Sequence, residues 1–543
     1  MTYVDTVIQL AVLMGGTLGL TIPFGLYIAR MISFEMRPLE KTLAKVESGF
    51  YKLVGIDASK QMTWKEYFFA LFLTNMIVVV FIILVLTLQN YLPSHQNFKG
   101  LSLDLAVHTA ISFVTDTNLQ HYAGDQQLSN LSQMVAITFT QFVAPASAIV
   151  AAFAFIRSFI RKNFGLGNFY MDFIRVIITL LLPVAVVSSL VFMATGVPQT
   201  LNTTVTSYTL EGNRKDIRVG PVASLLAIKQ LGSNGGGFYG ANSAHPFENP
   251  TGLSNMYEMF LMLVIPLSFP IAYAKLIGKW KGVSILVAML ISFGSLLIIA
   301  YTAISGPSLL ETRFGSFGSV LFNIVSLTTN TGAVNSSLLG MSPNAVTSLL
   351  VAMFVQAIPG AVGTGMMTMI IYVILTLFIV GLMVGKTPEF LSMKISPRVI
   401  KLSVFIFLIH PVLILIPTVI AFSSGNAQAI MGEGGKVTPL GFTQTLYEYT
   451  SAASNNGSDY FGTSANTPFF NVSTAIVMFL GRYAPLGLML AIAGSFTIKD
   501  RREVIEPIKT QGPLFISVLI VITFLLTALT FFPFLVIGPF SIQ

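Results

Sequence analysis

Four short polar runs in the sequence have the composition of an ion-coordinating site. They are rich in Gly, Asn, Ser and Thr: Thr115–Asn118, Ser233–Gly237, Thr328–Gly332 and Ser454–Gly457. Gly adopts backbone conformations that turn successive carbonyls in one direction, and Asn and Thr add neutral oxygens. A ring of such weak dipoles suits a weakly hydrated monovalent ion such as potassium, whereas a hard divalent ion would require clustered carboxylates.

A short apolar segment precedes each polar run and would position it. These segments have 12 or 13 residues: Ser102–Val114, Pro221–Gly232, Gly315–Leu327 and Phe442–Ala453. A helix of that length is about 18–20 Å long, which is too short for a hydrocarbon core of about 30 Å. We therefore expect four helices that enter the membrane and turn back, each pointing its partially negative C-terminal end at the polar run, which favours cations.

The rest of the chain is dominated by longer apolar segments. Of its 543 residues, 54% are apolar and only 10% are charged, which excludes an ordinary soluble protein. Ten segments are long enough to cross a membrane: Val7–Ala29, Tyr67–Leu88, Val135–Ile156, Phe173–Ala194, Met256–Ala274, Ile285–Ile304, Val346–Val384, Leu402–Phe422, Val472–Ala493 and Leu514–Val536. We predict an all-α polytopic protein embedded in a lipid bilayer.

Most Lys and Arg residues lie in the loops on one side of these spans. If the spans alternate, 22 of the 30 Lys and Arg residues fall in the loops opposite the polar runs. Those loops are predicted to be cytoplasmic, with both termini and the polar runs outside. The net charge of +8 is therefore a topology signal, and it gives little reason to expect nucleic-acid binding. The absence of Cys excludes disulfides and thiolate metal sites.

The order span, re-entrant helix, polar run, span occurs four times. Thr117, Gly235, Gly332 and Gly457 take corresponding positions, at spacings of 118, 97 and 125 residues. Because irregular backbone at membrane depth must be buried in protein or line water, we expect the four runs to meet at one axis. The repeat divides the chain into an N-terminal helix and loop (1–65), repeats at 66–165, 166–280, 281–398 and 399–500, and a C-terminal helix (501–543).

Two features within the spans could act on an ion after it leaves the polar runs. Residues 345–384 would form a helix of about 60 Å, so we expect it to break at Pro359–Gly360 and Gly363–Gly365, either as a gate or as a kink for close packing. Arg482 lies in the middle of another span, where a charge is costly. It could block leakage below the polar runs, or it could pair with a carboxylate or with helix-end carbonyls.

Several charged residues are expected near the outer mouth. Glu248, Glu311, Arg313 and Glu448 fall in or beside the outer loops. They would either influence the local concentration of cations or simply solvate the loops.

The segment Ile228–Thr251 closely resembles the signature of a known family. It reads IKQLGSNGGGFYGANSAHPFENPT, and similar stretches are GLMVGKTPEFLSMK (381–394), SAASNNGS (451–458) and AIAGS (491–495). The family is the potassium-binding A subunit (KdpA) of the bacterial and archaeal Kdp potassium-importing P-type ATPase. The resemblance covers nearly the whole chain. It implies four repeats of potassium-channel type, an extracellular selectivity filter, and delivery of the ion sideways into a partner pump subunit.

The resemblance also assigns residues to the filter and to the path below it. The filter positions would be Thr115, Asp116, Thr117, Ser233, Asn234, Gly235, Thr331, Gly332, Asn456 and Gly457. The gate and coupling positions would be Gln120, Gln356, Gly360, Gly363, Gly365 and Arg482. The sequence departs from the family pattern at Asp116, where Asn is expected and a carboxylate would raise the field strength. It departs again at Gln356, where an acidic residue is expected.

The chain has no recognisable ATP site of its own. Gly381–Thr387 fails the Walker pattern because Val380 stands where the first Gly is required, and no Asp-Lys-Thr-Gly-Thr run occurs. With the resemblance, this implies that the motor is the ATP-hydrolysing B subunit, accompanied by the single-span C subunit and the small F subunit, in the plasma membrane of a bacterium or archaeon. Two alternatives stay open: a stand-alone potassium channel or symporter of the Trk, Ktr and HKT type, and a membrane enzyme with clustered acids or His.

Overall fold

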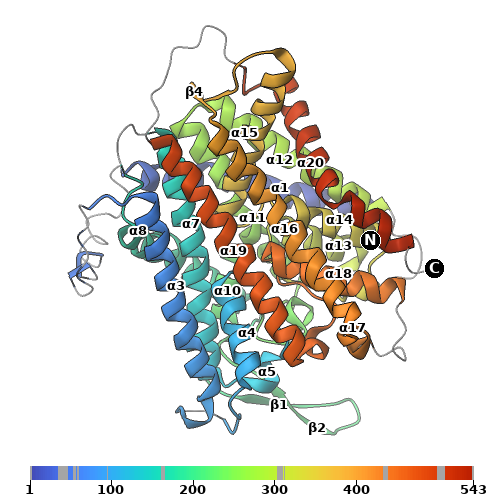
Figure 1. Ribbon diagram of the computed structural model, residues 1–543. Helices are drawn as coiled ribbons and strands as arrows, with labels where there is room; N and C mark the ends of the chain where they lie inside the picture. The colour runs from blue at the N-terminus through green and yellow to red at the C-terminus, as the bar shows by residue number, and fades with distance from the viewer. Residues whose placement is uncertain are drawn as a thin grey trace.

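The computed structural model describes most of the chain and consists mainly of long helices (Figure 1). The described residues are 3–34, 47–49, 51–52, 55, 57, 60–93, 96–160, 165–302, 310, 312–431, 438–497 and 508–540. Within these ranges, ten helical segments are long and apolar enough to cross a membrane. The predicted number of spans is confirmed, and the chain is a multi-pass membrane protein.

The spanning segments are single helices or stacked helical pieces. The single helices are α1 (Tyr3–Ser33), α3 (Trp64–Thr87), α11 (Gly252–Leu276), α12 (Lys279–Thr302), α15 (Thr364–Val384), α16 (Pro397–Ser423), α19 (Pro468–Thr497) and α20 (Pro513–Phe540). Two others contain a π-helical turn: α6 (Asn130–Ser132), η2 (Gln133–Thr138) and α7 (Phe139–Ile160); then α8 (Phe169–Val176), η3 (Ile177–Leu181) and α9 (Leu182–Ala194).

Four short helices lie between pairs of these spans, as predicted. They are α4 (Leu103–Val114), α10 (Val222–Leu231), α13 (Gly315–Thr328) and α18 (Pro439–Ser454), and we call them the pore helices. Each is mostly buried among the long helices. The fold therefore repeats the unit of span, pore helix and span four times with pseudo-symmetry, and α1 and α20 are the extra helices at the two ends.

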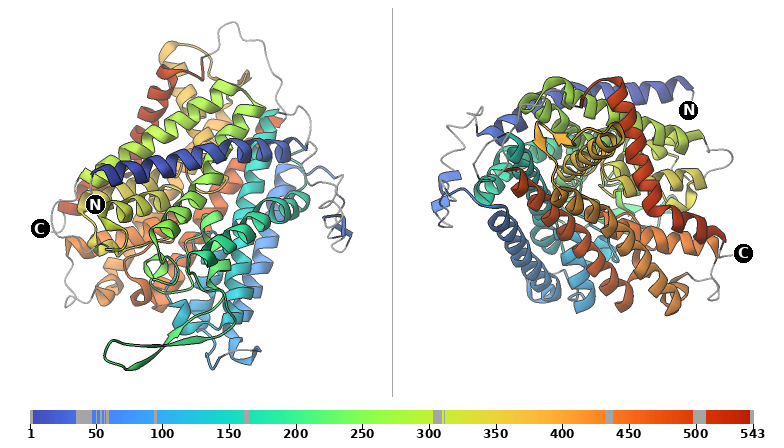
Figure 2. Two further views of the ribbon diagram at one scale, coloured as in Figure 1. Left: turned by 180° about the vertical axis from the view of Figure 1, so that it is seen from behind. Right: turned by 45° about the horizontal axis from the view of Figure 1, so that its top comes forward.

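Burial separates the central helices from those that face lipid. Nearly all of α7 is buried, and its small residues let neighbouring backbones approach closely. By contrast, α3 exposes Phe69 and Ile77, each 62% accessible, on one side and buries Tyr67 on the other. α1 lies across the outside of the bundle against α11 (Figure 2). A bilayer would cover these exposed apolar side chains.

The expected break in the segment 345–384 is present. α14 (Pro343–Val355) ends at Gln356, which takes a left-handed conformation with φ of 53°. α15 begins after Gly363, and both Gly360 and Gly363 have φ of 78°. Residues 356–363 therefore form a loop between the two helices, which we call the break loop. It folds where Pro removes a backbone donor and Gly permits positive φ.

Short elements fill the connections at the two ends of the bundle. A two-stranded antiparallel hairpin pairs Thr204 with Arg218 and Tyr208 with Arg214, and it projects from the bottom of Figure 1. The hairpin consists of β1 (Thr204–Tyr208) and β2 (Arg214–Arg218), and the other short elements are η1 (Gln89–Tyr91), α5 (Gly124–Gln127), η4 (Asn242–Ala244), η5 (Leu338–Gly340), α17 (Asn426–Ile430) and η6 (Gly462–Ala465). β3 (Glu389–Phe390) and β4 (Met393–Lys394) pair at the opposite end.

Candidate functional site

The chain leaves all four pore helices in the same conformation. In each case a residue with a positive φ follows the end of the helix by one or two positions, and the N–H of the next residue donates to a carbonyl five residues earlier. The four left-handed residues are Asp116, Ser233, Asn330 and Asn455, with φ of 63°, 58°, 50° and 55°. The four hydrogen bonds are Thr117 to Ser112, Asn234 to Lys229, Thr331 to Ser326 and Asn456 to Ser451, at 2.7–2.9 Å. This shared geometry aligns the four loops residue by residue.

The alignment corrects the predicted register of the first loop. Thr117 was expected to correspond to Gly235, Gly332 and Gly457, but the structural match places Asn118 there. Asn118 has φ of 56°, so an Asn stands where the third and fourth loops use a Gly with positive φ. The prediction was wrong by one residue because Asn tolerates the left-handed region almost as a Gly does, and the sequence pattern relied on Gly alone.

The four loops meet in a closed ring. The Cα of Gly235 lies so close to the carbonyl oxygen of Thr331 that a Cβ would overlap it. Gly332 approaches the carbonyl oxygen of Asn456 in the same way, and Gly457 approaches that of Thr117. At the remaining seam, Asn118 Nδ2 donates to Asn234 Oδ1 at 3.3 Å. The order around the ring is thus second, third, fourth and first loop, and three Gly residues are required by close approach.

The second loop is held by two glutamines from neighbouring segments. The side-chain amide of Gln141 on α7 donates to the carbonyl of Gly236 at 2.9 Å. The backbone carbonyl of Gln141 accepts from Asn234 Nδ2 at 3.1 Å. That carbonyl is available because Pro145, four residues later, has no N–H. Gln120 both donates to and accepts from the backbone of Gly237, at 3.2 and 2.9 Å. Gln120 is therefore placed to position the second loop.

The acidic residues expected near the mouth are buried pairs rather than solvated charges. Lys229 Nζ contacts Glu248 Oε2 at 2.8 Å, and both side chains are fully buried. Glu448 Oε1 lies 3.0 Å from His121 Nε2, also fully buried. Arg313 donates to the backbone carbonyl of Asn249. These contacts brace the loops around the ring, and Glu311 lies outside the described residues.

Arg482 pairs with the first loop. Its Nη2 lies 3.3 Å from Asp116 Oδ2, and the two side chains are 7% and 1% exposed. It also donates to the carbonyl of Ala144 at 3.5 Å. Of the two roles considered for this arginine, the structure thus contains the pair with a carboxylate, and the partner is one of the predicted filter residues.

A cavity begins at the ends of the third and fourth pore helices. Asn330, Ser454 and Asn455 line it together with Gln356 and Arg482. It continues beside residues of α15, α16 and α20, including Thr368, Tyr372, His410, Thr527 and Thr530. The cavity therefore extends sideways between the third repeat, the fourth repeat and α20.

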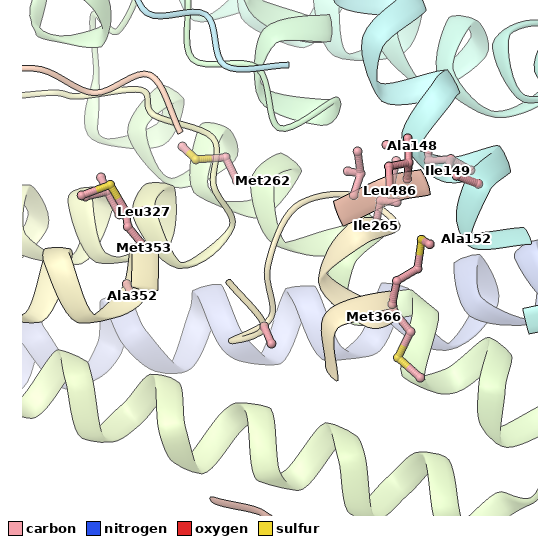
Figure 3. Close-up of a cluster of buried hydrophobic side chains, with 14 of the residues drawn as sticks. Ala148, Ile149, Ala152, Met262, Ile265, Leu327, Ala352, Met353, Met366 and Leu486 are labelled. Atoms are coloured by element: carbon pink, nitrogen blue, oxygen red, sulfur yellow. The ribbon is translucent and has the colours of Figure 1, made fainter. Parts of the chain in front are cut away.

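Apolar side chains from all four repeats pack against one another in the interior. Ile149 from α7, Ile265 from α11, Met366 from α15 and Leu486 from α19 belong to one buried cluster (Figure 3). The break loop contacts both the end of the pore helix α13 and the long helix α7. The N–H of Gly360 donates to the carbonyl of Thr328 at the end of α13, and Gly363 packs against the backbone of α7.

Sequence reasoning identified most of the ring but missed three residues. Asn118, Asn330 and Asn455 join neighbouring loops and have positive φ. The available signal was an Asn two to four residues after the end of each short apolar segment, because Asn is the non-Gly residue that best tolerates this conformation. Within the described ranges, no three His, Asp or Glu side chains gather as a metal-binding cluster.

Comparison with known proteins gives two findings. The sequence matches the family described as "KdpA: Potassium-transporting ATPase A subunit" over residues 11–542. The fold is similar to that of the crystal structure of the potassium transporter TrkH from Vibrio parahaemolyticus, with a TM-score of 0.52 and 16% identity. That similarity covers 78% of this chain and 85% of the other. At such low identity it shows a shared fold and nothing about chemistry.

Proposed function

Because this chain belongs to the family of potassium-transporting ATPase A subunits, we propose that it is the potassium-binding, channel-like subunit of an ATP-driven Kdp import complex. In this proposal, the ring of four loops is a selectivity filter that binds extracellular potassium. The ion then passes through an intramembrane tunnel to the ATP-hydrolysing B subunit, with the C and F subunits completing the complex. The closed ring is the observation that carries the proposal.

The chemistry of the ring supports potassium as the ion. Its loops offer backbone carbonyls together with hydroxyl and amide oxygens, which replace the hydration shell of a weakly hydrated ion. The pore helices end at the loops, so the partially negative ends of four helix dipoles favour a cation there. The proposed ligands are Thr115, Thr117, Ser233, Asn234, Gly235, Thr331, Gly332, Asn456 and Gly457, and Asp116, the remaining predicted filter residue, pairs with Arg482.

The lateral cavity supports delivery of the ion to a partner. A channel that conducts straight through the membrane would need a polar route along the axis, and buried apolar side chains from all four repeats pack in the interior instead. The cavity has polar groups among its mixed polar and apolar lining, and it extends sideways. We assign Gln356, Gly360, Gly363 and Gly365 to a gate at its entrance, because Gln356 and Ala361 of the break loop line the cavity together with Asn330 and Asn455 of the ring.

The proposed orientation of the chain in the membrane is based on the distribution of Lys and Arg among the loops. The loops rich in Lys and Arg lie opposite the polar loops in the predicted topology, which places the ring outside the cell and both termini outside. The start of α1 and the end of α20 lie on the same side of the bundle in Figure 1, in agreement with this assignment. The membrane would be the plasma membrane of a bacterium or archaeon.

Equilibrium binding of rubidium, a potassium analogue, to the purified chain tests the filter. We expect Gly235→Arg to abolish high-affinity binding, because its side chain would enter the space occupied by the third loop. Gly252→Arg is the matched control, since Gly252 has open space around it. Unchanged binding in Gly235→Arg would refute the filter assignment.

A stand-alone channel or symporter is the second candidate, because the fold is similar to that of TrkH. Proteoliposomes that contain only this chain distinguish the two. The subunit proposal predicts no sustained potassium uptake until the ATP-hydrolysing partner and ATP are added. Uptake by the chain alone, driven by an ion gradient, would favour the channel or symporter.

A further inference from the structure

The left-handed residues of the third and fourth loops join neighbouring loops in the same way. In the third loop, Asn330 Nδ2 donates to the carbonyl of Ser454 in the fourth loop at 3.1 Å. In the fourth loop, Asn455 Nδ2 donates to Thr117 Oγ1 in the first loop at 2.9 Å. Each amide therefore joins its own loop to the next one around the ring.

In the second loop, the hydroxyl of the equivalent residue, Ser233, has no hydrogen-bond partner among the described residues. The first loop is not joined by an amide in this way either. Its equivalent residue is Asp116, and an ionised carboxylate has no hydrogen to donate. The carboxylate instead accepts from Arg482 on α19. Its second oxygen, Oδ1, is buried and has no hydrogen-bond partner among the described residues. The first loop is thus held by a charge pair from outside the ring rather than by an amide within it.

The surroundings make Asp116 the counter-charge of Arg482. None of the described residues that line the cavity beside Arg482 is acidic. A guanidinium at this depth is costly without a partner, and removing one member of a buried pair leaves an uncompensated charge. Such a charge would repel any cation that enters the ring or the cavity.

We propose that Asp116 and Arg482 form one neutral unit, in which Asp116 is the counter-ion of Arg482 rather than a ligand of the transported cation. Arg482 is then a positioning residue that holds the first loop as the amides hold the third and fourth. The inference rests on the proposed function only in that it needs a cation site at the ring. It assigns to Asp116 a role different from the one expected from the sequence.

Opposite effects of the two single substitutions would distinguish this role from a merely structural one. Asp116→Asn leaves a positive charge below the ring and should weaken rubidium binding about tenfold or more. Arg482→Gln leaves a negative charge and should tighten cation binding while lowering discrimination between potassium and sodium. The double variant is neutral again and should return close to the affinity of the unmodified chain.

Moving the negative charge from position 116 to position 356 gives a second test. Gln356 lines the same cavity as Arg482 and differs from Glu by one group. Adding Gln356→Glu to Asp116→Asn should recover most of the lost affinity, although the first loop has not been restored. Asp172→Asn is the matched control. Asp172 forms a comparably buried pair with Arg157, away from the ring, so its loss should lower thermal stability and leave rubidium affinity unchanged.

The results separate the two proposals. If the unmodified chain binds no rubidium, the proposed function fails. If it binds but both single variants weaken binding, and neither the double variant nor Gln356→Glu restores it, Asp116 is a direct ligand and the inference is wrong. If Asp116→Asn does not fold, the sign of the Arg482→Gln effect still decides: tighter, less selective binding supports the unit, and weaker binding overturns it.

Discussion

Replacing Gly332 with Ala would test the close packing of the four loops in the ring. Gly332 has φ of 81°, and a Cβ there would lie 2.7 Å from the carbonyl carbon of Asn456 and 3.0 Å from the amide nitrogen of Ser458. Carbon atoms in contact are normally about 3.5–4.0 Å apart, so the third and fourth loops would have to separate by roughly 1 Å. Because both contacts are with backbone, no side-chain rotation can relieve them.

The loss of stability expected for Gly332→Ala is the sum of two costs. Placing Ala in the left-handed region costs about 1–2 kcal/mol wherever it occurs. Overpacking adds about 1–3 kcal/mol when the neighbours cannot move. Gly385→Ala isolates the first part, because Gly385 has φ of 70° and no atom within 4 Å of a Cβ. The difference between the two variants is the cost of pushing the loops apart.

Rubidium affinity and thermal unfolding, measured on both variants, provide the assay. Gly385→Ala should be slightly destabilised and bind normally. Gly332→Ala should be destabilised further, and each 1.4 kcal/mol of strain expressed at the ion site lowers affinity tenfold. If Gly332→Ala binds rubidium as tightly as Gly385→Ala does, the third and fourth loops do not form the constriction inferred here.

Three further outcomes follow from the same structure. Lys229→Met should cost about 3–5 kcal/mol of stability by leaving Glu248 charged and buried, and adding Glu248→Gln should recover most of it, as measured by thermal unfolding. Asn118→Gly should keep rubidium binding within about fivefold, since Gly suits its φ of 56° and one hydrogen bond of about 1 kcal/mol is lost; a collapse of binding would show that this side chain has a further role. Burial holds the pKa of His245 below its usual value, and its Nδ1 accepts from the N–H of Phe247 at 3.1 Å. The stabilisation is therefore present above the unfolded pKa of about 6.5 and is lost as pH falls towards the lower folded pKa, so His245→Gln should flatten the decline in melting temperature below neutral pH.

The arrangement of spans and pore helices could be predicted because it depends on length and hydropathy. A segment such as Leu103–Val114 is apolar but too short to cross, and no tertiary contact is needed to see this. The break after α14 was equally visible, since Pro359 and Gly360 interrupt a segment twice the length of a span. These features are local, so the sequence specifies them directly.

The pairing of side chains could not be predicted in the same way. Asp116 and Arg482 are 366 residues apart, and their contact depends on how the first and fourth repeats close the ring. Glu248 and Glu448 were expected near the outer mouth, either concentrating cations or solvating the loops, but tertiary packing buries both. A burial pattern set by four converging repeats is not encoded in the hydropathy of any one of them.

The four repeats are alike in the ring of loops, where an ion would be selected. They differ in the helices that follow the ring, where an ion would be routed. The four loops leave their helices through the same hydrogen bond, because four matched loops are the simplest way to surround one ion. The helices that follow do not match: α7 and α19 each contain one internal Pro, α11 contains two, and only the third repeat breaks into α14 and α15. A symmetric lower half could direct an ion only along the axis. Under the proposed function, the break beside the cavity would give the ion one lateral direction, and that direction would face the subunit that receives it.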